Sequence, residues 1–246
     1  MPAAAATTEL TITPGRTRRQ IDSLLRSQGV SGSYYGATRN SRLLNPATYG
    51  APARTNSLEG FLFPDTYQLT DPVGISALVA DQLTNFKKQF ATVDLRYARR
   101  QHLTPYAVLT VASMIEGEAQ TAGDRPLVAS VIYNRLRLGM PLQLDATTRY
   151  ATGNYTGPLT QAQIKSPSPY NTRVHKGLPP TPIDNPGLTA IQAAAHPAHT
   201  NYLYFVVLPC GNGKEVFDSS YQKFLHDSQR YQAARAKHGG RSPAHC

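Results

Sequence analysis

The strongest constraint on the fold lies in the middle of the chain, where start and stop signals delimit two consecutive helices. Thr104 can cap the first helix, and Pro105 can occupy its first position, where a missing N–H costs nothing. Apolar residues then recur at helical spacing, and Gly139 can end the second helix. We therefore expect helices over residues 105–120 and 124–138.

The first of these helices carries two glutamates in its last turns, Glu116 and Glu118. Because each helical residue advances by about 100°, Glu118 lies beside the apolar stripe that contains Val111 and Ile115, whereas Glu116 lies further round. A carboxyl group beside apolar side chains is partly desolvated, which raises its pKa and favours the protonated form. A general acid acting on a glycosidic oxygen needs that form. The alternative is that both glutamates are solvated acids on an ordinary helical surface.

The rest of the chain mixes helices with short strands. We expect further helices over residues 17–28, 74–90, 94–101, 160–165, 188–195 and 219–237. We expect strands over 8–13, 141–147, 202–208 and 215–217, the last two joined as a hairpin. Residues 31–57 and 166–187 show no period and are predicted to be loops, and a loop as long as the second is usually functional. This mixture predicts an α+β fold.

A chain of 246 residues suits one domain with a small lobe. We expect that domain to span residues 8–237, with an N-terminal lobe over 8–57 and a catalytic core over 58–237. Residues 1–7 are expected to be a disordered or artificial lead, and residues 238–246 a flexible tail. Within the compact apolar run that begins at Leu58, Glu59 is expected to be a buried, paired acid with a structural role.

Two segments offer polar side chains that could bind a polysaccharide. Alternation along predicted strand 141–147 directs Gln143 and Asp145 to one face, which could line a cleft or be a solvated surface. The long loop contains Tyr170, Asn171 and Thr172, which could offer a ring face and hydrogen bonds to sugar hydroxyl and amide groups. Ordinary turn chemistry would also explain the asparagine.

Composition narrows the class of partner. There are 25 Lys and Arg residues against 15 Asp and Glu, a formal charge of +10, so an anionic partner is favoured, such as nucleic acid, lipid headgroups or a cell-wall polymer. No apolar run approaches the roughly 18 residues of a membrane span, so the chain as given is expected to be soluble. His196 and His199 are spaced like metal ligands, but Pro197 interrupts the helical face and no further ligand cluster is evident. No nucleic-acid-binding module is recognisable.

Five segments, in this order, resemble the YceG-like (MltG) endolytic murein transglycosylases. They are LEGFLFPDTYQL (58–69), ASMIEGEA (112–119), LVASVIYNRLRLGMPLQLDAT (127–147), SPYNT with KGLPP (168–180) and AAAHPAHTNYLYFV (193–206). The resemblance extends from about residue 10 to residue 226.

The resemblance implies cleavage of the β-1,4 bond between N-acetylmuramic acid and N-acetylglucosamine within a peptidoglycan strand, giving 1,6-anhydro-muramyl ends and limiting the length of nascent strands. It implies Glu118 as the catalytic acid and base, with no metal or organic cofactor. Thr147, at the end of the third motif, joins the expected substrate-binding residues. The expected partners are peptidoglycan strands and peptidoglycan synthases, not nucleic acid.

The resemblance also has implications for location and for points of difference. It implies an extracytoplasmic domain of a protein anchored by a single N-terminal membrane helix, where a Cys210–Cys246 disulfide would be compatible with the compartment. Family members usually carry Lys and Thr on either side of the acid, where this chain has Gly117 and Ala119. Proline is common in place of Ala146 and glycine in place of Thr181. These differences affect substrate positioning more than the chemistry.

Three other functions remain open at this point. A lysozyme-like hydrolase would use Glu118 as the acid and Asp145 or Glu116 to direct water. A non-catalytic peptidoglycan-binding module would keep the fold without turnover. The charge of the chain is the one feature that supports a nucleic-acid binder, and this function ranks last.

Overall fold

The computed structural model describes residues 7–70 and 74–239, and it has the predicted α+β character. The helices are α1 (Arg18–Ser27), α2 (Tyr34–Ala37), the 3₁₀ turn η1 (Pro46–Tyr49), α3 (Ile75–Phe90), α4 (Arg96–Arg100), α5 (Pro105–Glu118), α6 (Arg125–Arg137), α7 (Asp145–Thr152), α8 (Gln161–Ile164), α9 (Leu188–Ala195) and α10 (Tyr221–Lys237). The strands are β1 (Thr7–Thr11), β2 (Thr66–Thr70), β3 (Tyr204–Val207) and β4 (Glu215–Asp218).

The chain forms two compact units, which are described separately. The first contains the residues up to Gly117 together with Leu178–Ala195, and the second contains Glu118–Gly177 and the residues from His196 onward. Residues 8–57, expected to form a lobe of their own, belong with residues 58–117 in the first unit.

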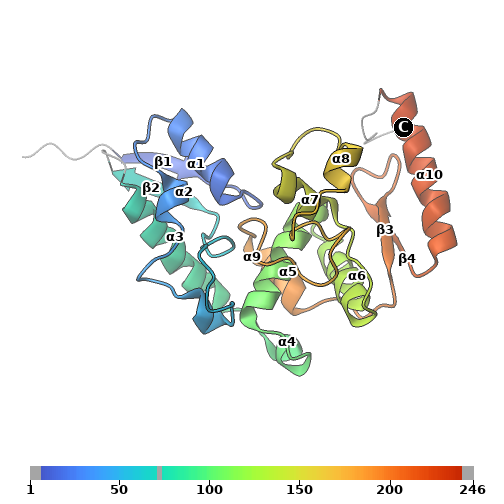
Figure 1. Cartoon of the computed structure of the whole chain (residues 1–246), viewed down its shortest axis with the longest axis horizontal. Helices are drawn as coiled ribbons and strands as arrows, with labels where there is room; N and C mark the ends of the chain where they lie inside the picture. The colour runs from blue at the N-terminus through green and yellow to red at the C-terminus, as the bar shows by residue number, and fades with distance from the viewer. Residues whose placement is uncertain (1–6, 71–73, 240–246) are drawn as a thin grey trace, which may run out of the picture. The chain divides into compact units, whose positions relative to one another are not determined.

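In the first unit, β1 and β2 form an antiparallel pair in which Leu10 lies opposite Tyr67 (Figure 1). Beneath them is an aromatic cluster in which Phe61 meets Phe86 edge-on with ring centroids 5.1 Å apart, and Tyr49 meets Phe61 at 5.3 Å. Such contacts add to the stabilisation that the buried area provides. Strand β2 was not predicted, because its partner lies more than 50 residues away and its five residues carry little periodic signal of their own.

Helix boundaries follow the expected capping signals. Thr17 caps α1 with its side chain accepting from the Gln20 N–H, and Gln20 returns a contact to the Thr17 N–H in a reciprocal capping box. Thr104 caps α5: its hydroxyl accepts a hydrogen bond from the Ala107 N–H. Helix α5 is buried along most of its length, because apolar residues occupy nearly its whole circumference.

The prediction of a strand over residues 141–147 is wrong. Residues 141–144 are irregular, and helix α7 begins at Asp145. Leu142 and Leu144 are both buried as the alternation suggested, but Gln143 has φ +57°, a left-handed conformation that no strand contains. Asp145 instead occupies the first turn of the helix, where a carboxylate is favoured by the helix dipole.

In the second unit, β3 and β4 form the predicted antiparallel hairpin, with Phe205 opposite Phe217. Helix α10 lies along this hairpin, as Figure 1 shows, and α6 contacts β3. Among the described residues, no helix is both long and apolar enough to cross a membrane. Cys246 of the expected disulfide, residues 1–6 of the expected lead (1–7) and residues 240–246 of the expected tail (238–246) lie outside the described part of the chain. Thr7, which was expected to belong to the lead, is the first residue of β1.

Glu59 is buried and paired, as expected for a structural acid. Its Oε1 accepts hydrogen bonds from the Arg18 N–H (2.8 Å) and from Asn185 Nδ2 (3.1 Å). Asn185 Oδ1 in turn accepts from the N–H groups of Gly60 and Leu62, so the pair ties the apolar segment to the loop before α9.

The carboxyl of Asp184 is buried in the same region, and its Oδ1 has no hydrogen-bond partner among the residues that the structure describes. Burial, with the negative charges of Glu116 and Glu59, raises the pKa of Asp184 well above its usual range. The folded protein therefore holds a proton that the unfolded chain releases above about pH 4, and this contribution to stability declines as the pH rises above that value.

We expect Asp184→Asn to stabilise the protein increasingly as the pH rises from 5 to 8, because the neutral amide needs no proton uptake. The gain in unfolding free energy should grow by up to about 1.4 kcal/mol per pH unit. Urea unfolding across this pH range measures it. A difference that stays constant with pH would contradict the assignment of a protonated Asp184.

Candidate active site

Glu118 is the last residue of α5, and its carboxylate reaches the start of α7. Its Oε1 accepts a hydrogen bond from the backbone N–H of Ala146 at 2.7 Å. Ala146 is the second residue of α7, so its N–H is one of the donors that a helix leaves free in its first turn. The contact fixes the position of the carboxyl group.

Burial is the largest influence on Glu118 and raises its pKa to about 7. The hydrogen bond from Ala146 acts in the opposite direction, the negative charge of Asp145 raises the pKa further, and Arg173 and Arg149 lower it. A carboxyl with this pKa is both protonated and ionised in substantial fractions near neutral pH. It can therefore give up a proton and take one back without a large free-energy cost.

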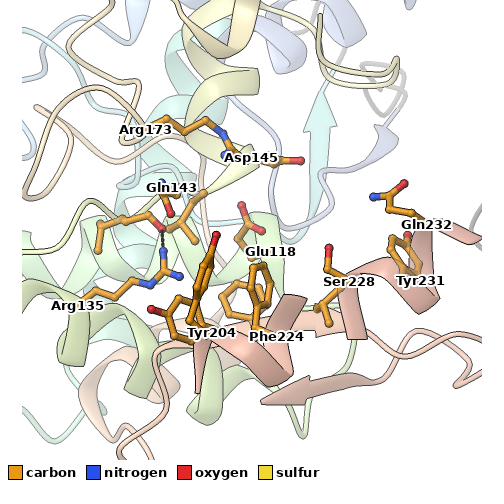
Figure 2. Close-up of a pocket in the computed structure, with 15 residues that line it drawn as sticks. Glu118, Arg135, Gln143, Asp145, Arg173, Tyr204, Phe224, Ser228, Tyr231 and Gln232 are labelled. Atoms are coloured by element: carbon orange, nitrogen blue, oxygen red, sulfur yellow. Dashed lines mark hydrogen bonds and ion pairs between the residues drawn. The ribbon is translucent and has the colours of Figure 1, made fainter. Parts of the chain in front are cut away.

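Glu118 opens onto a cavity of about 370 Å³ within the second unit (Figure 2). The polar part of its wall includes Gln143, Asp145, Arg135 and Arg173, and the aromatic part comes from β3 and α10. The complete lining consists of Glu118, Arg135, Leu142, Gln143, Leu144, Asp145, Arg173, Tyr204, Phe205, Val206, Tyr221, Phe224, Ser228, Tyr231 and Gln232. A concave site with mixed apolar and polar walls is the usual setting for a ligand with both characters.

Asp145 and Arg173 form an ion pair on the cavity wall. The Asp145 side chain is 50% exposed and that of Arg173 29% exposed, so both can still face a ligand. The left-handed backbone at Gln143 leaves this side chain exposed between two buried leucines, and it also lines the cavity. The structure thus brings two of the predicted binding residues, Gln143 and Asp145, together with Glu118.

Three other predicted binding residues are buried beside the cavity. The hydroxyls of Thr147 and Thr172 lie 2.8 Å apart, and the Leu144 N–H donates to the Thr172 hydroxyl. Asn171 Nδ2 donates to the carbonyls of Ile164 and Ser166, at 2.9 and 2.8 Å. These groups hold the long loop against the start of α7, and a role for them in binding would act through the shape of that loop.

The remaining predicted binding residue, Tyr170, is absent from the cavity lining. Its ring lies against that of Tyr150, with centroids 4.9 Å apart. It could meet only a ligand that extends beyond the cavity.

Sequence reasoning missed most of the cavity wall. Arg135 is nearly buried, and its Nε and Nη1 donate to the carbonyls of Leu203 (2.6 Å) and Leu142 (2.7 Å). Its guanidinium also lies over the Tyr204 ring, 5.3 Å from the centroid. The sequence offered one signal for these contacts: an arginine in the middle of an apolar helical face, where a buried charge needs hydrogen-bond partners.

A second carboxyl with a raised pKa lies near Glu118. Burial, followed by the charges of Glu118 and Asp124, raises the pKa of Glu215 to about 8, and in the described part of the chain its Oε2 has no hydrogen-bond partner. The negative charge of ionised Glu118 therefore opposes ionisation of Glu215. Within the described residues, no group of three His, Cys, Asp or Glu side chains is arranged to hold a metal ion.

The proteins that this chain resembles in sequence and in structure carry the names YceG-like protein or endolytic murein transglycosylase. The model of the YceG-like family matches residues 2–230. A Bacillus subtilis protein named endolytic murein transglycosylase is 36% identical over 174 residues, which is 71% of this chain and 48% of that protein. A Streptococcus pneumoniae protein of the same name is 36% identical over 156 residues, 61% of this chain and 28% of that protein.

The fold has a match among solved structures. The crystal structure of a YceG-like protein from Listeria monocytogenes superposes with a TM-score of 0.78 at 28% identity, covering 91% of this chain and 76% of that one. The chain spans about half or less of the length of the curated relatives it matches.

Proposed function

Because this chain belongs to the YceG-like family, we propose that it is an endolytic peptidoglycan lytic transglycosylase with Glu118 as its catalytic residue. The substrate is the β-1,4 bond between N-acetylmuramic acid and N-acetylglucosamine inside a glycan strand. The two curated relatives carry the corresponding name. The observation that carries the proposal is the position of Glu118, held by Ala146 and facing the cavity, with a pKa raised to about 7.

The proposed reaction needs a single carboxyl group. Protonated Glu118 gives its proton to the glycosidic oxygen while the bond from that oxygen to C1 of the muramyl sugar breaks. The Glu118 carboxylate then accepts the proton of the muramyl 6-hydroxyl, whose oxygen forms the new bond to C1. The 1,6-anhydro product forms without water, and Glu118 returns to its protonated state.

The surroundings of Glu118 suit both halves of this cycle. Burial favours the neutral acid for the first step, while the Ala146 N–H and the nearby arginines stabilise the carboxylate that follows. Gln143 and the Asp145–Arg173 pair are proposed to position sugar substituents at the polar end of the cavity. Synthase partners and a membrane anchor upstream remain expectations from the family.

Product analysis tests the proposal. Purified glycan strands without stem peptides are incubated with the protein, and the new ends are identified by mass spectrometry. We expect anhydro-muramyl ends from internal cleavage. Reducing ends would show a hydrolase and make Asp145 the candidate base, and intact strands would leave a binding module.

The pH dependence of kcat/KM is a separate prediction. Since the first step needs protonated Glu118, kcat/KM should be level below pH 7 and fall about tenfold per pH unit well above it. Ala146→Pro removes the N–H that lowers this pKa, so the fall should move to higher pH by about one pH unit.

Two features make this variant interpretable. Proline already occupies the second position of α6, at Pro126, so the start of α7 is expected to tolerate it. Ala146→Gly keeps the N–H and serves as the matched control. If both variants gave the wild-type profile, the Ala146 hydrogen bond would not influence the catalytic acid.

A further inference from the structure

Helix α10 presents an unusual surface to the cavity. None of its 17 residues is buried, yet five of them line the cavity that contains Glu118. These five are Tyr221, Phe224, Ser228, Tyr231 and Gln232, and they are called the α10 stripe below. Each of the five lies three or four residues from another member, and Tyr231 and Gln232 are consecutive, so together they follow one face of the helix.

The stripe begins against an aromatic cluster on β3. The Tyr204 ring is stacked on Phe224 with centroids 5.3 Å apart, and Tyr221 lies 5.4 Å from Tyr204. Tyr221 is nevertheless 53% exposed, so these contacts leave much of its ring uncovered. Packing of α10 on the hairpin therefore accounts for only part of this aromatic surface.

The stripe also has a direction. Figure 2 shows Phe224 next to Glu118, with Ser228, Tyr231 and Gln232 following along α10 away from it, on the side opposite Arg135 and Gln143. From its first residue to its last, the stripe covers eleven helical steps, or about 16 Å. It is long enough to contact more than one sugar ring.

Its chemistry selects an uncharged, amphipathic ligand. All five side chains are neutral, in a chain with a formal charge of +10, so the stripe offers no counter-charge to a phosphate or a carboxylate. The rings of the tyrosines can pack on the apolar C–H faces of a sugar, while their hydroxyls, Ser228 and Gln232 can bond its polar groups. Sugars combine these two kinds of surface.

We propose that the α10 stripe is a binding surface for the glycan strand, and that its Ser228, Tyr231 and Gln232 hold successive sugar rings on one side of the bond that Glu118 cleaves, the side away from Arg135 and Gln143. This inference rests on the proposed function and deepens it. Sugars held along α10 require the strand to continue past the cleaved bond in that direction. The stripe thereby favours internal positions over the strand end on that side.

The test uses the inactive variant Glu118→Gln, so that binding can be measured without cleavage. Glycan strands with the stem peptides removed, separated by length, are titrated into this protein and into versions that also carry Tyr231→Ala, alone or combined with Gln232→Ala. We expect Kd for long strands to rise about tenfold in each, with a much smaller change for the shortest strands, which can be held near Glu118 alone.

Two controls separate binding from folding. Gln229→Ala removes an exposed side chain of α10 outside the cavity lining and should leave Kd unchanged. Tyr231→Phe keeps the ring and should retain most of the affinity. Circular dichroism of each variant checks that the helix is intact.

The outcomes distinguish this inference from the proposed function. Unchanged Kd at every length, with Tyr231→Ala alone and combined with Gln232→Ala, would overturn the stripe as a binding surface and leave the transglycosylase assignment standing. An equal loss at all lengths would also overturn it, because a surface away from the cleaved bond must act mainly on long strands. If the parent variant bound no strand and the wild type cleaved none, both would be overturned.

Discussion

Glu118→Gln is expected to lower the rate of glycan cleavage by about a thousandfold or more, because the same carboxyl is proposed to act first as acid and then as base. The amide oxygen of glutamine can still accept the hydrogen bond that the Ala146 N–H donates to Glu118 Oε1 at 2.7 Å. The side chain should therefore stay in place while its proton chemistry is lost. Single-turnover cleavage of purified strands, with anhydro ends counted by mass spectrometry, measures the effect.

Glu116→Gln provides the matched control, two residues earlier on the same helix. Glu116 Oε2 accepts from the Gly187 N–H at 3.0 Å, a contact within the first unit that an amide oxygen can also make. We expect less than about a threefold loss of activity, because a substitution that keeps the hydrogen bond of the original side chain usually has a small effect. If Glu116→Gln abolished cleavage and Glu118→Gln did not, the roles assigned to the two glutamates would be reversed.

Arg135→Leu is expected to lower the free energy of unfolding by about 3 kcal/mol. The guanidinium is nearly buried and donates to the carbonyls of Leu203 and Leu142, which join β3 and the start of the cavity wall to α6. Leucine fills part of the volume but leaves both carbonyls without these donors, and each such loss costs about 1–3 kcal/mol. Urea unfolding followed by circular dichroism measures the change.

Activity should fall with stability in this variant, because Leu142 and Tyr204 both line the cavity. Arg137→Leu is the control on the same helix: Arg137 is exposed, and its Nη2 donates to Asn134 Oδ1 at 3.4 Å. We expect it to change the unfolding free energy by less than about 0.5 kcal/mol. Equal destabilisation by the two variants would mean that the positive charge of an arginine on α6, and not the carbonyl contacts of Arg135, stabilises the fold.

Local signals predicted much of the helical framework. The capping pattern at Thr104 and the proline after it gave the start of α5, and the prediction for α9 coincides with Leu188–Ala195. The hairpin of β3 and β4 followed from a short turn between two apolar runs. These features depend on interactions within a few residues, which is why the sequence alone could indicate them.

Signals from distant partners were missed or misread. Strand β2 exists because β1 pairs with it across more than 50 residues. The alternation over residues 141–147 reflects the burial of Leu142 and Leu144 without any strand, because the left-handed Gln143 and the helix that starts at Asp145 take its place. Periodicity reports which side chains are buried but not the backbone that buries them.

By itself, the sequence determined most of the longer helices, the α+β character, the family motifs and the choice of Glu118 over Glu116 as the residue beside apolar side chains; it did not predict α2, η1 or α7. Only the tertiary structure decided what surrounds that carboxyl. The Ala146 N–H, the Asp145–Arg173 pair, Arg135 and the α10 stripe come from segments up to about a hundred residues away. Burial by distant segments sets both the pKa and the cavity, and no local pattern encodes which segments will meet.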